Sequence, residues 1–198
     1  MMERHAVPII SFQVALRTGS TEDPAGKEGL GGITNDLLRK GTKSKSADQI
    51  SAQLDFIGAT FGTTENFDTL RVTAEFLKKD LPAGLALLSE IVRQPAFTQT
   101  EVDKLLKQRV DEIRSSKDEP DGVINDYYRG YLFGKHPYSR PPGGDEKSLP
   151  KITRADIAAF YENHYVPENM VISVAGDFSA AEMEKELAAQ FGSMPKKA

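Results

Sequence analysis

The sequence contains no cysteine and no tryptophan, and it has only three histidines among 198 residues. Without cysteine the chain forms neither a disulfide nor a cysteine-ligated zinc site, and its redox compartment stays open. His5, His136 and His164 are too scattered to form a metal-ligand pattern. We expect His136, framed by Gly134 and Pro137, to lie in a turn, and His164 to cap or pack at a helix end.

Long hydrophobic runs, basic stripes and common catalytic loops are also missing. Hydrophobic residues make up 39%, charged residues 27%, and the formal net charge is −4. No apolar run is long enough to cross a bilayer, and no basic-aromatic pattern indicates a nucleic-acid partner. Neither a Gly-x-Ser-x-Gly turn nor a phosphate-binding loop is present, and no secretory signal is visible. The length suits one core, so we expect a single domain over residues 1–198.

The hydrophobic pattern predicts a sheet with helices inserted between its strands. Strands are expected at residues 10–16, 59–65, 70–76 and 171–175, with a turn at 66–68 joining the middle pair. Helices are expected to begin after Ser46, Asp80, Thr98 and Ser179, each of which can cap a helix, and another covers residues 153–164. This order argues α+β, with one mixed, largely antiparallel sheet and helices layered on one face.

A further helix is expected after Pro120, through Tyr131. Its tyrosines Tyr127, Tyr128 and Tyr131 recur at helical spacing, and we expect them to serve packing rather than ligand binding.

Residues 29–42 read Gly-Leu-Gly-Gly-Ile-Thr-Asn-Asp-Leu-Leu-Arg-Lys-Gly-Thr. Leu30, Ile33, Leu37 and Leu38 share one helical face, and Gly41 can end the helix. Periodicity alone therefore favours an ordinary amphipathic helix.

The wider sequence resembles the first half of pitrilysin/insulinase-type zinc peptidases, the family that includes mitochondrial processing peptidase. The similar blocks span nearly the whole chain and lie at residues 7–12, 18–20, 27–30, 40–42, 134–138, 161–170 and 174–177. In active members, the helix matching residues 29–42 carries the zinc motif H-x-x-E-H. Its histidines bind zinc, and its glutamate polarises the zinc-bound water.

Here Gly32, Asn35 and Asp36 stand at the three functional positions of that motif. The family's third ligand, a glutamate on a later helix, corresponds to Glu112, 112 − 36 = 76 positions after Asp36. These four residues are interpreted as a degenerate zinc-site remnant. Asp36 and Glu112 could instead hold a hard cation, although such ions need several oxygen ligands.

The resemblance implies a LuxS/processing-peptidase-like half that is inactive alone and has no catalytic residue, metal or other cofactor of its own. We expect it to help enclose peptide substrates with a homologous subunit that carries zinc. The alternative is a structural or assembly subunit with no role in proteolysis, and an autonomous hydrolase ranks behind both. The sequence does not decide between the bacterial periplasm and the cytoplasm as its location, and family analogy favours the periplasm.

The resemblance also implies a peptide-binding strand at the edge of the sheet. In the family this strand pairs with the substrate main chain. The corresponding residues here are Thr60, Phe61, Gly62, Thr63 and Thr64.

Overall fold

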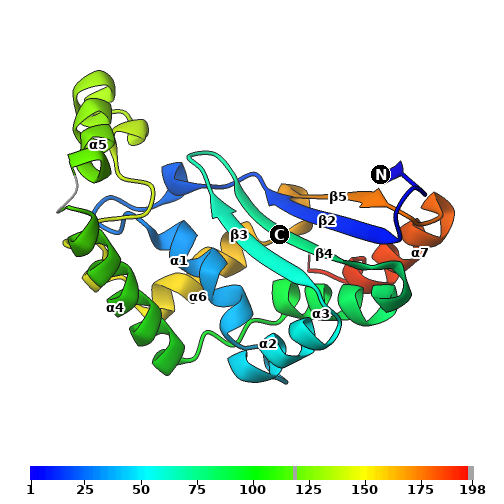
Figure 1. Cartoon of the computed structure of the whole chain (residues 1–198). Coiled ribbons are helices and arrows are strands. Elements are labelled where there is room, and N and C mark those ends of the chain that lie inside the picture. The colour runs from blue at the N-terminus through cyan, green and yellow to red at the C-terminus, as the bar shows by residue number, and fades with distance from the viewer. Residues whose placement is uncertain (118–119, 196–198) are drawn as a thin grey trace.

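The computed structural model describes residues 1–117 and 120–195. Its centre is a five-stranded sheet in the order β1-β5-β2-β4-β3. The first pair, β1 and β5, is parallel and all other pairs are antiparallel (Figure 1). The strands are β1 Met2–Glu3, β2 Ile9–Leu16, β3 Thr60–Glu65, β4 Leu70–Leu77 and β5 Met170–Gly176. This confirms the mixed, largely antiparallel sheet predicted from the sequence.

The face of the sheet to which β4 turns its exposed side chains is open. The helices are grouped on the other face (Figure 1). They are α1 Leu30–Leu37, α2 Ala47–Phe56, α3 Leu81–Arg93, α4 Gln99–Ser116, α5 Pro120–Phe133, α6 Arg154–His164 and α7 Ala180–Phe191. The predicted α+β architecture is therefore confirmed. Among the described residues, no helix combines the length and the hydropathy needed to cross a membrane.

Side-chain alternation on the central strands explains why only one face is covered. On β2 the residues Ile10, Phe12, Val14 and Leu16 are buried, whereas those between them are partly exposed. The same alternation on β4 buries Leu70, Val72, Ala74 and Phe76, and the register pairs the two apolar rows. Burying each large apolar side chain contributes roughly 1.5–3 kcal/mol, which fixes the register of both strands.

Local capping signals were predictive at some helix ends. Ser46 accepts a hydrogen bond from the Gln49 amide at 3.2 Å, and the Gln49 side chain accepts one from the Ser46 amide at 2.8 Å. This confirms the predicted cap of α2. Thr153 and Asp156 form an equivalent reciprocal cap on α6.

At three other helix starts the predicted side-chain cap was wrong, although the helices begin there. Asp80 and Thr98 precede α3 and α4, and Ser179 precedes α7, without a side-chain hydrogen bond to the helix. At α7 the Glu3 carboxylate accepts a hydrogen bond from the first helical amide, that of Ala180, at 2.5 Å. At α3 the preceding 3-10 turn leaves Asp80 outside the extended conformation usual for a capping residue.

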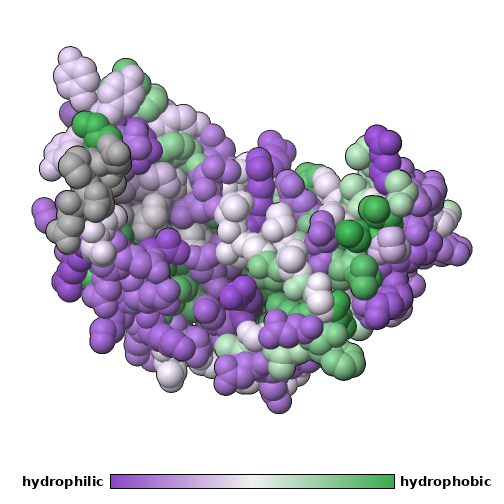
Figure 2. All heavy atoms as spheres, in the orientation of Figure 1, coloured by the Kyte–Doolittle hydropathy of each residue, from purple (hydrophilic) through white to green (hydrophobic). Residues whose placement is uncertain are grey.

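Helix α5 stands apart from the helical layer (Figure 1) and packs mainly against the short turn Pro137–Ser139. The prediction that its tyrosines are packed is wrong, since Tyr127, Tyr128 and Tyr131 are 76%, 60% and 91% exposed. Figure 2 shows this region as a projecting surface with pale aromatic and green apolar atoms. The exposed apolar surface of α5, called the α5 surface below, comprises Ile124, Tyr127, Tyr128, Tyr131, Leu132 and Phe133.

Candidate functional site

Helix α1, which carries the predicted zinc-site remnant, begins against a buried carboxylate. Asp23 is only 3% exposed, and its two oxygens accept hydrogen bonds from the Gly29 and Gly31 amides at 2.8 Å each. Gly29 adopts φ +93°, a left-handed conformation that favours glycine. Burial raises the pKa of Asp23 to about 7, and the amide hydrogen bonds oppose this rise. Sequence reasoning missed Asp23 because five residues of loop separate it from Gly29.

Gly32 is buried, and the Glu65 side chain fills the space beside it. A Cβ atom on Gly32 would lie 2.0 Å from Oε2 of Glu65, well inside any contact distance. Glu65 is the last residue of β3, and its side chain points to the helical face of the sheet. Its Oε1 atom is buried and has no hydrogen-bond partner among the described residues. Burial, followed by the charges of Asp23 and Asp36, raises the pKa of Glu65 to about 8.

Asn35 is 1% exposed and connects α1 to the sheet. Its amide nitrogen donates to the carbonyls of Thr64 at 3.2 Å and Arg71 at 3.0 Å. Its amide oxygen accepts from the buried Tyr165 hydroxyl at 3.1 Å. Every polar atom of this side chain is therefore engaged in holding α1, the β3–β4 hairpin and the segment after α6 together.

Asp36 lies in a cluster of polar side chains between α1, β3 and α4. The Thr63 hydroxyl donates to one carboxylate oxygen at 2.5 Å, and Arg109 forms an ion pair with the other. The guanidinium also lies 3.7 Å from the Glu112 carboxylate. Glu112 is about half exposed, and Gln108 donates to it at 2.9 Å. The guanidinium of Arg109 thus lies between the carboxylates of Asp36 and Glu112. Sequence reasoning missed Arg109.

The four predicted remnant residues do not fit a zinc ion in this arrangement. Gly32 offers no ligand atom, and a carboxylate stands where its side chain would be. Asn35 is committed to two strand carbonyls and a tyrosine, and Asp36 is neutralised by Arg109. A guanidinium between Asp36 and Glu112 repels a divalent ion from the only two carboxylates of the set. Within the described residues, no three His, Asp or Glu side chains converge as metal ligands do.

The predicted peptide-binding strand, β3, lies at one edge of the sheet. It pairs with β4 on one side, and no strand of the described chain covers its other side. Phe61 and Thr63 share the helical face, since their partners on β4 are the buried Ala74 and Val72. Residues Thr60, Gly62 and Thr64 therefore face the open side of the sheet. The strand could add a further strand by main-chain hydrogen bonds.

His136 and His164 both contact neighbouring aromatic rings. The His136 ring accepts from the Tyr138 amide at 3.2 Å within a short turn, which confirms its predicted turn position. His164 ends α6, where its ring lies 3.1 Å from the Thr18 hydroxyl and packs on Phe160.

Comparison with known proteins identifies the family of the chain. A family model described as insulinase, peptidase family M16, matches residues 2–145. The chain belongs to peptidase family M16. A second model, described as the peptidase M16 inactive domain, matches residues 151–198. The resemblance to pitrilysin/insulinase-type peptidases inferred from the sequence is thereby confirmed.

Among curated relatives, an uncharacterized zinc protease of Rickettsia bellii is 26% identical over 93% of this chain and 45% of its own length. The uncharacterized zinc protease YmxG of Bacillus subtilis is 26% identical over 95% of this chain and 46% of its own. The M16 chain therefore spans less than half the length of these relatives.

Among solved structures, the peptidase M16 inactive domain from Pseudomonas fluorescens has a TM-score of 0.94 at 27% identity. It is matched over 99% of this chain and 48% of that one. The first half of the periplasmic protease PqqL from Escherichia coli has a TM-score of 0.87 at 20% identity, over 98% of this chain and 43% of that one. At that identity the second likeness shows the fold alone.

Proposed function

We propose that this M16 chain is a non-catalytic half that grips extended peptides and encloses them together with a homologous, zinc-carrying partner. The observation that supports this most is the Glu65 carboxylate in the space beside Gly32. The Glu65 carboxylic acid occupies the space that a zinc ligand at position 32 would need. Burial raises its pKa to about 8, so its charged form is disfavoured there. We take this as a sign that the position serves the packing of the half rather than metal binding.

The chemistry of the remaining positions supports the same proposal. Hydrolysis by this family's chemistry needs a metal-polarised water and a base to take its proton. Asn35 has no basic atom at neutral pH, and its amide is used in three hydrogen bonds. The carboxylate of Asp36 is held in an ion pair with Arg109, so Asp36 does not replace that base.

Peptide binding can survive the loss of cleavage, because it uses the main chain. The free edge of β3 offers amide and carbonyl groups to an extended peptide, and the pairing needs no metal. The Thr63 side chain is turned to Asp36, so the strand is anchored from its helical face.

A binding and cleavage experiment tests the first part of the proposal. Unstructured fluorescent peptides should bind the purified chain and remain intact by mass spectrometry over hours with added zinc. Two matched peptides, N-methylated at alternate odd or alternate even residues, should differ in affinity, because an added strand donates to β3 from only one of the two sets. Peptide cleavage that is lost in Glu112→Gln, or equal binding of both methylated peptides, would contradict it.

The partner is tested by co-expression with an M16 homologue from the same genome that retains H-x-x-E-H. We expect copurification, and peptidase activity of the pair above that of the homologue alone. A catalytically dead homologue, with Gln in place of its motif Glu, is the control and should copurify without activity.

The alternative is a structural or assembly subunit, and the α5 surface favours it. A helix with six exposed large apolar side chains is suited to a protein interface. If the chain copurifies with a homologue, binds no peptide and leaves its activity unchanged, this alternative replaces the proposal.

A further inference from the structure

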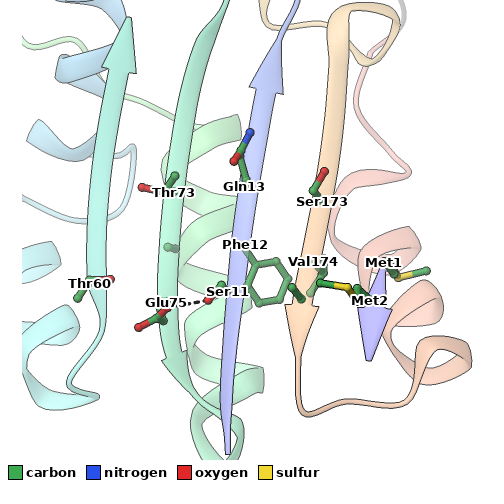
Figure 3. Close-up of a pocket in the computed structure, with 12 residues that line it drawn as sticks. Met1, Met2, Ser11, Phe12, Gln13, Thr60, Thr73, Glu75, Ser173 and Val174 are labelled. Carbon is green, nitrogen blue, oxygen red and sulfur yellow. Dashed lines mark hydrogen bonds between the residues drawn. The ribbon is translucent and has the colours of Figure 1, made fainter. Parts of the chain in front are cut away.

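The open face of the sheet carries charges next to the free edge strand. Thr60, Gly62 and Thr64 of β3 face this side, and their register partners on β4 are Glu75, Thr73 and Arg71. Figure 3 looks onto this face and shows Thr60, Thr73 and Glu75 beside the Ser11, Gln13 and Ser173 side chains. Together with Met1 and Met2 at the far edge, these side chains line a depression of about 580 Å³.

Two opposite charges on β4 have no ionic partner among the residues that the structure describes. Arg71 and Glu75 are both exposed, and within the described residues neither has an oppositely charged group within 4.0 Å. Glu75 accepts one hydrogen bond, from the Ser11 hydroxyl at 2.6 Å, and its charge stays uncompensated. The other side chains that line the depression are hydroxyls, an amide and apolar groups, so Glu75 is the one charged side chain among them.

The geometry points to two charge subsites for a bound peptide. We propose that Arg71 and Glu75 select extended peptides that carry an acidic and a basic side chain four residues apart. This inference rests on the proposed function, because pairing with β3 supplies the main-chain contacts that bring the peptide into register. It names the class of peptide that the edge prefers.

Strand geometry fixes the spacing. Side chains at i, i+2 and i+4 of a peptide strand lie on one face, and residues i and i+4 are about 13 Å apart. Arg71 and Glu75 are themselves i and i+4 on β4, so a parallel or antiparallel peptide matches both charges at once. A spacing of three would put the two peptide charges on opposite faces.

The intervening strand leaves room for contact across it. A peptide beside β3 lies about 10 Å from β4, two strand spacings away. Only the short side chains of Thr60 and Thr64 stand between, so long side chains from both strands can meet over them. Gly62 has no side chain, and the middle residue of the peptide can lie over it toward Thr73. Solvent-exposed ion pairs of this kind change an equilibrium by about two- to fivefold each, and salt weakens them.

Fluorescence anisotropy with labelled decapeptides tests the proposal on the whole chain. The peptides have Glu and Lys separated by three neutral residues in either order, the same charges separated by two, and a Gln/Gln version. We expect the four-residue spacing in one order to bind about five- to twentyfold tighter than the other three at low salt. The preferred order reports the direction of the bound peptide.

Charge reversal distinguishes the subsites from general electrostatics. The double variant Arg71→Glu with Glu75→Lys should prefer the opposite order of charges at the same spacing. A matched control, Glu182→Lys with Lys185→Glu on the exposed face of α7, should keep the original preference. Equal binding of all four peptides, or an unchanged preference in the reversed variant, would overturn the charge subsites while leaving edge binding intact. If no peptide binds, the proposed function and this inference fail together.

Discussion

The carboxylate of Glu65 stands where a side chain on Gly32 would have to be. The two are so close that a Cβ atom at residue 32 would lie 2.0 Å from Oε2 of Glu65. A larger residue at position 32 therefore requires the Glu65 side chain to move. Restoring the zinc motif on α1 therefore also requires a change at Glu65 on β3.

Metal binding should return only when Glu65 is shortened. We expect Gly32→His with Asp36→His to bind zinc no better than the parent chain, because the new side chain at position 32 must first displace the buried Glu65 carboxylate. Adding Glu65→Ala should open the space and raise zinc affinity at least tenfold, with Glu112 as a further ligand. Competition with a chromogenic chelator measures this, with Glu65→Ala alone as the control. Equal zinc affinity with and without Glu65→Ala would show that Glu65 does not block the position.

Stability should fall as pH rises toward 8. The pKa of Glu65 is about 8 in the folded chain against an ordinary 4.5, so between these values the folded state holds an extra proton. The free energy of unfolding then decreases with pH by up to about 1.4 kcal/mol per unit and levels off above pH 8. Asp23, with a pKa of about 7, acts in the same direction below pH 7.

Glu65→Gln isolates the contribution of Glu65 to this pH dependence. Urea unfolding between pH 5 and 8.5 should show a flatter curve for the variant, which gains stability over the parent chiefly at the alkaline end. Glu162→Gln, an exposed change on α6, is the control and should follow the parent. Parallel curves for Glu65→Gln and the parent would contradict the assigned titration.

Asn35 should matter for stability rather than for catalysis. Asn35→Ala leaves the Tyr165 hydroxyl and two strand carbonyls without their partner, and each unsatisfied buried group costs roughly 1–3 kcal/mol. We expect a loss of about 2–4 kcal/mol in urea unfolding. Combining it with Tyr165→Phe should cost less than the sum of the two changes. Asn163→Ala on the surface of α6 is the control, and an equally small loss for Asn35→Ala would refute the role of Asn35.

The α5 surface should make the isolated chain associate at high concentration. Tyr127 and Tyr131 are exposed four residues apart on α5, and Ile124 adds apolar area beside them. Tyr127→Lys with Tyr131→Glu should shift light scattering toward the monomer. Phe56→Ser provides the control, because Phe56 is 90% exposed but lies on α2, away from this surface. A parent chain that is monomeric at millimolar concentration would count against an interface on α5.

Local patterns were sufficient for four of the five strands and most helix positions, whereas the short β1 was not predicted. The alternation on β2 and β4 determined which face is buried, because a one-residue slip would expose every apolar side chain of the strand. The capping box at Ser46 was also readable, since its partner Gln49 is three residues away. Capping failed at Asp80 because the preceding 3-10 turn leaves this residue outside the extended conformation usual for a capping residue. Spacing alone does not report the backbone conformation that a neighbouring turn imposes.

The sequence by itself determined the family resemblance and the replacement of the zinc motif by Gly32, Asn35 and Asp36. Only the tertiary structure decided what occupies that position, because Glu65, Asp23 and Arg109 reach it from separate elements. It also turned the α5 tyrosines outward, since helical spacing does not say which face finds a partner. Contacts distant in sequence depend on how sheet and helices are layered, and no local pattern encodes that arrangement.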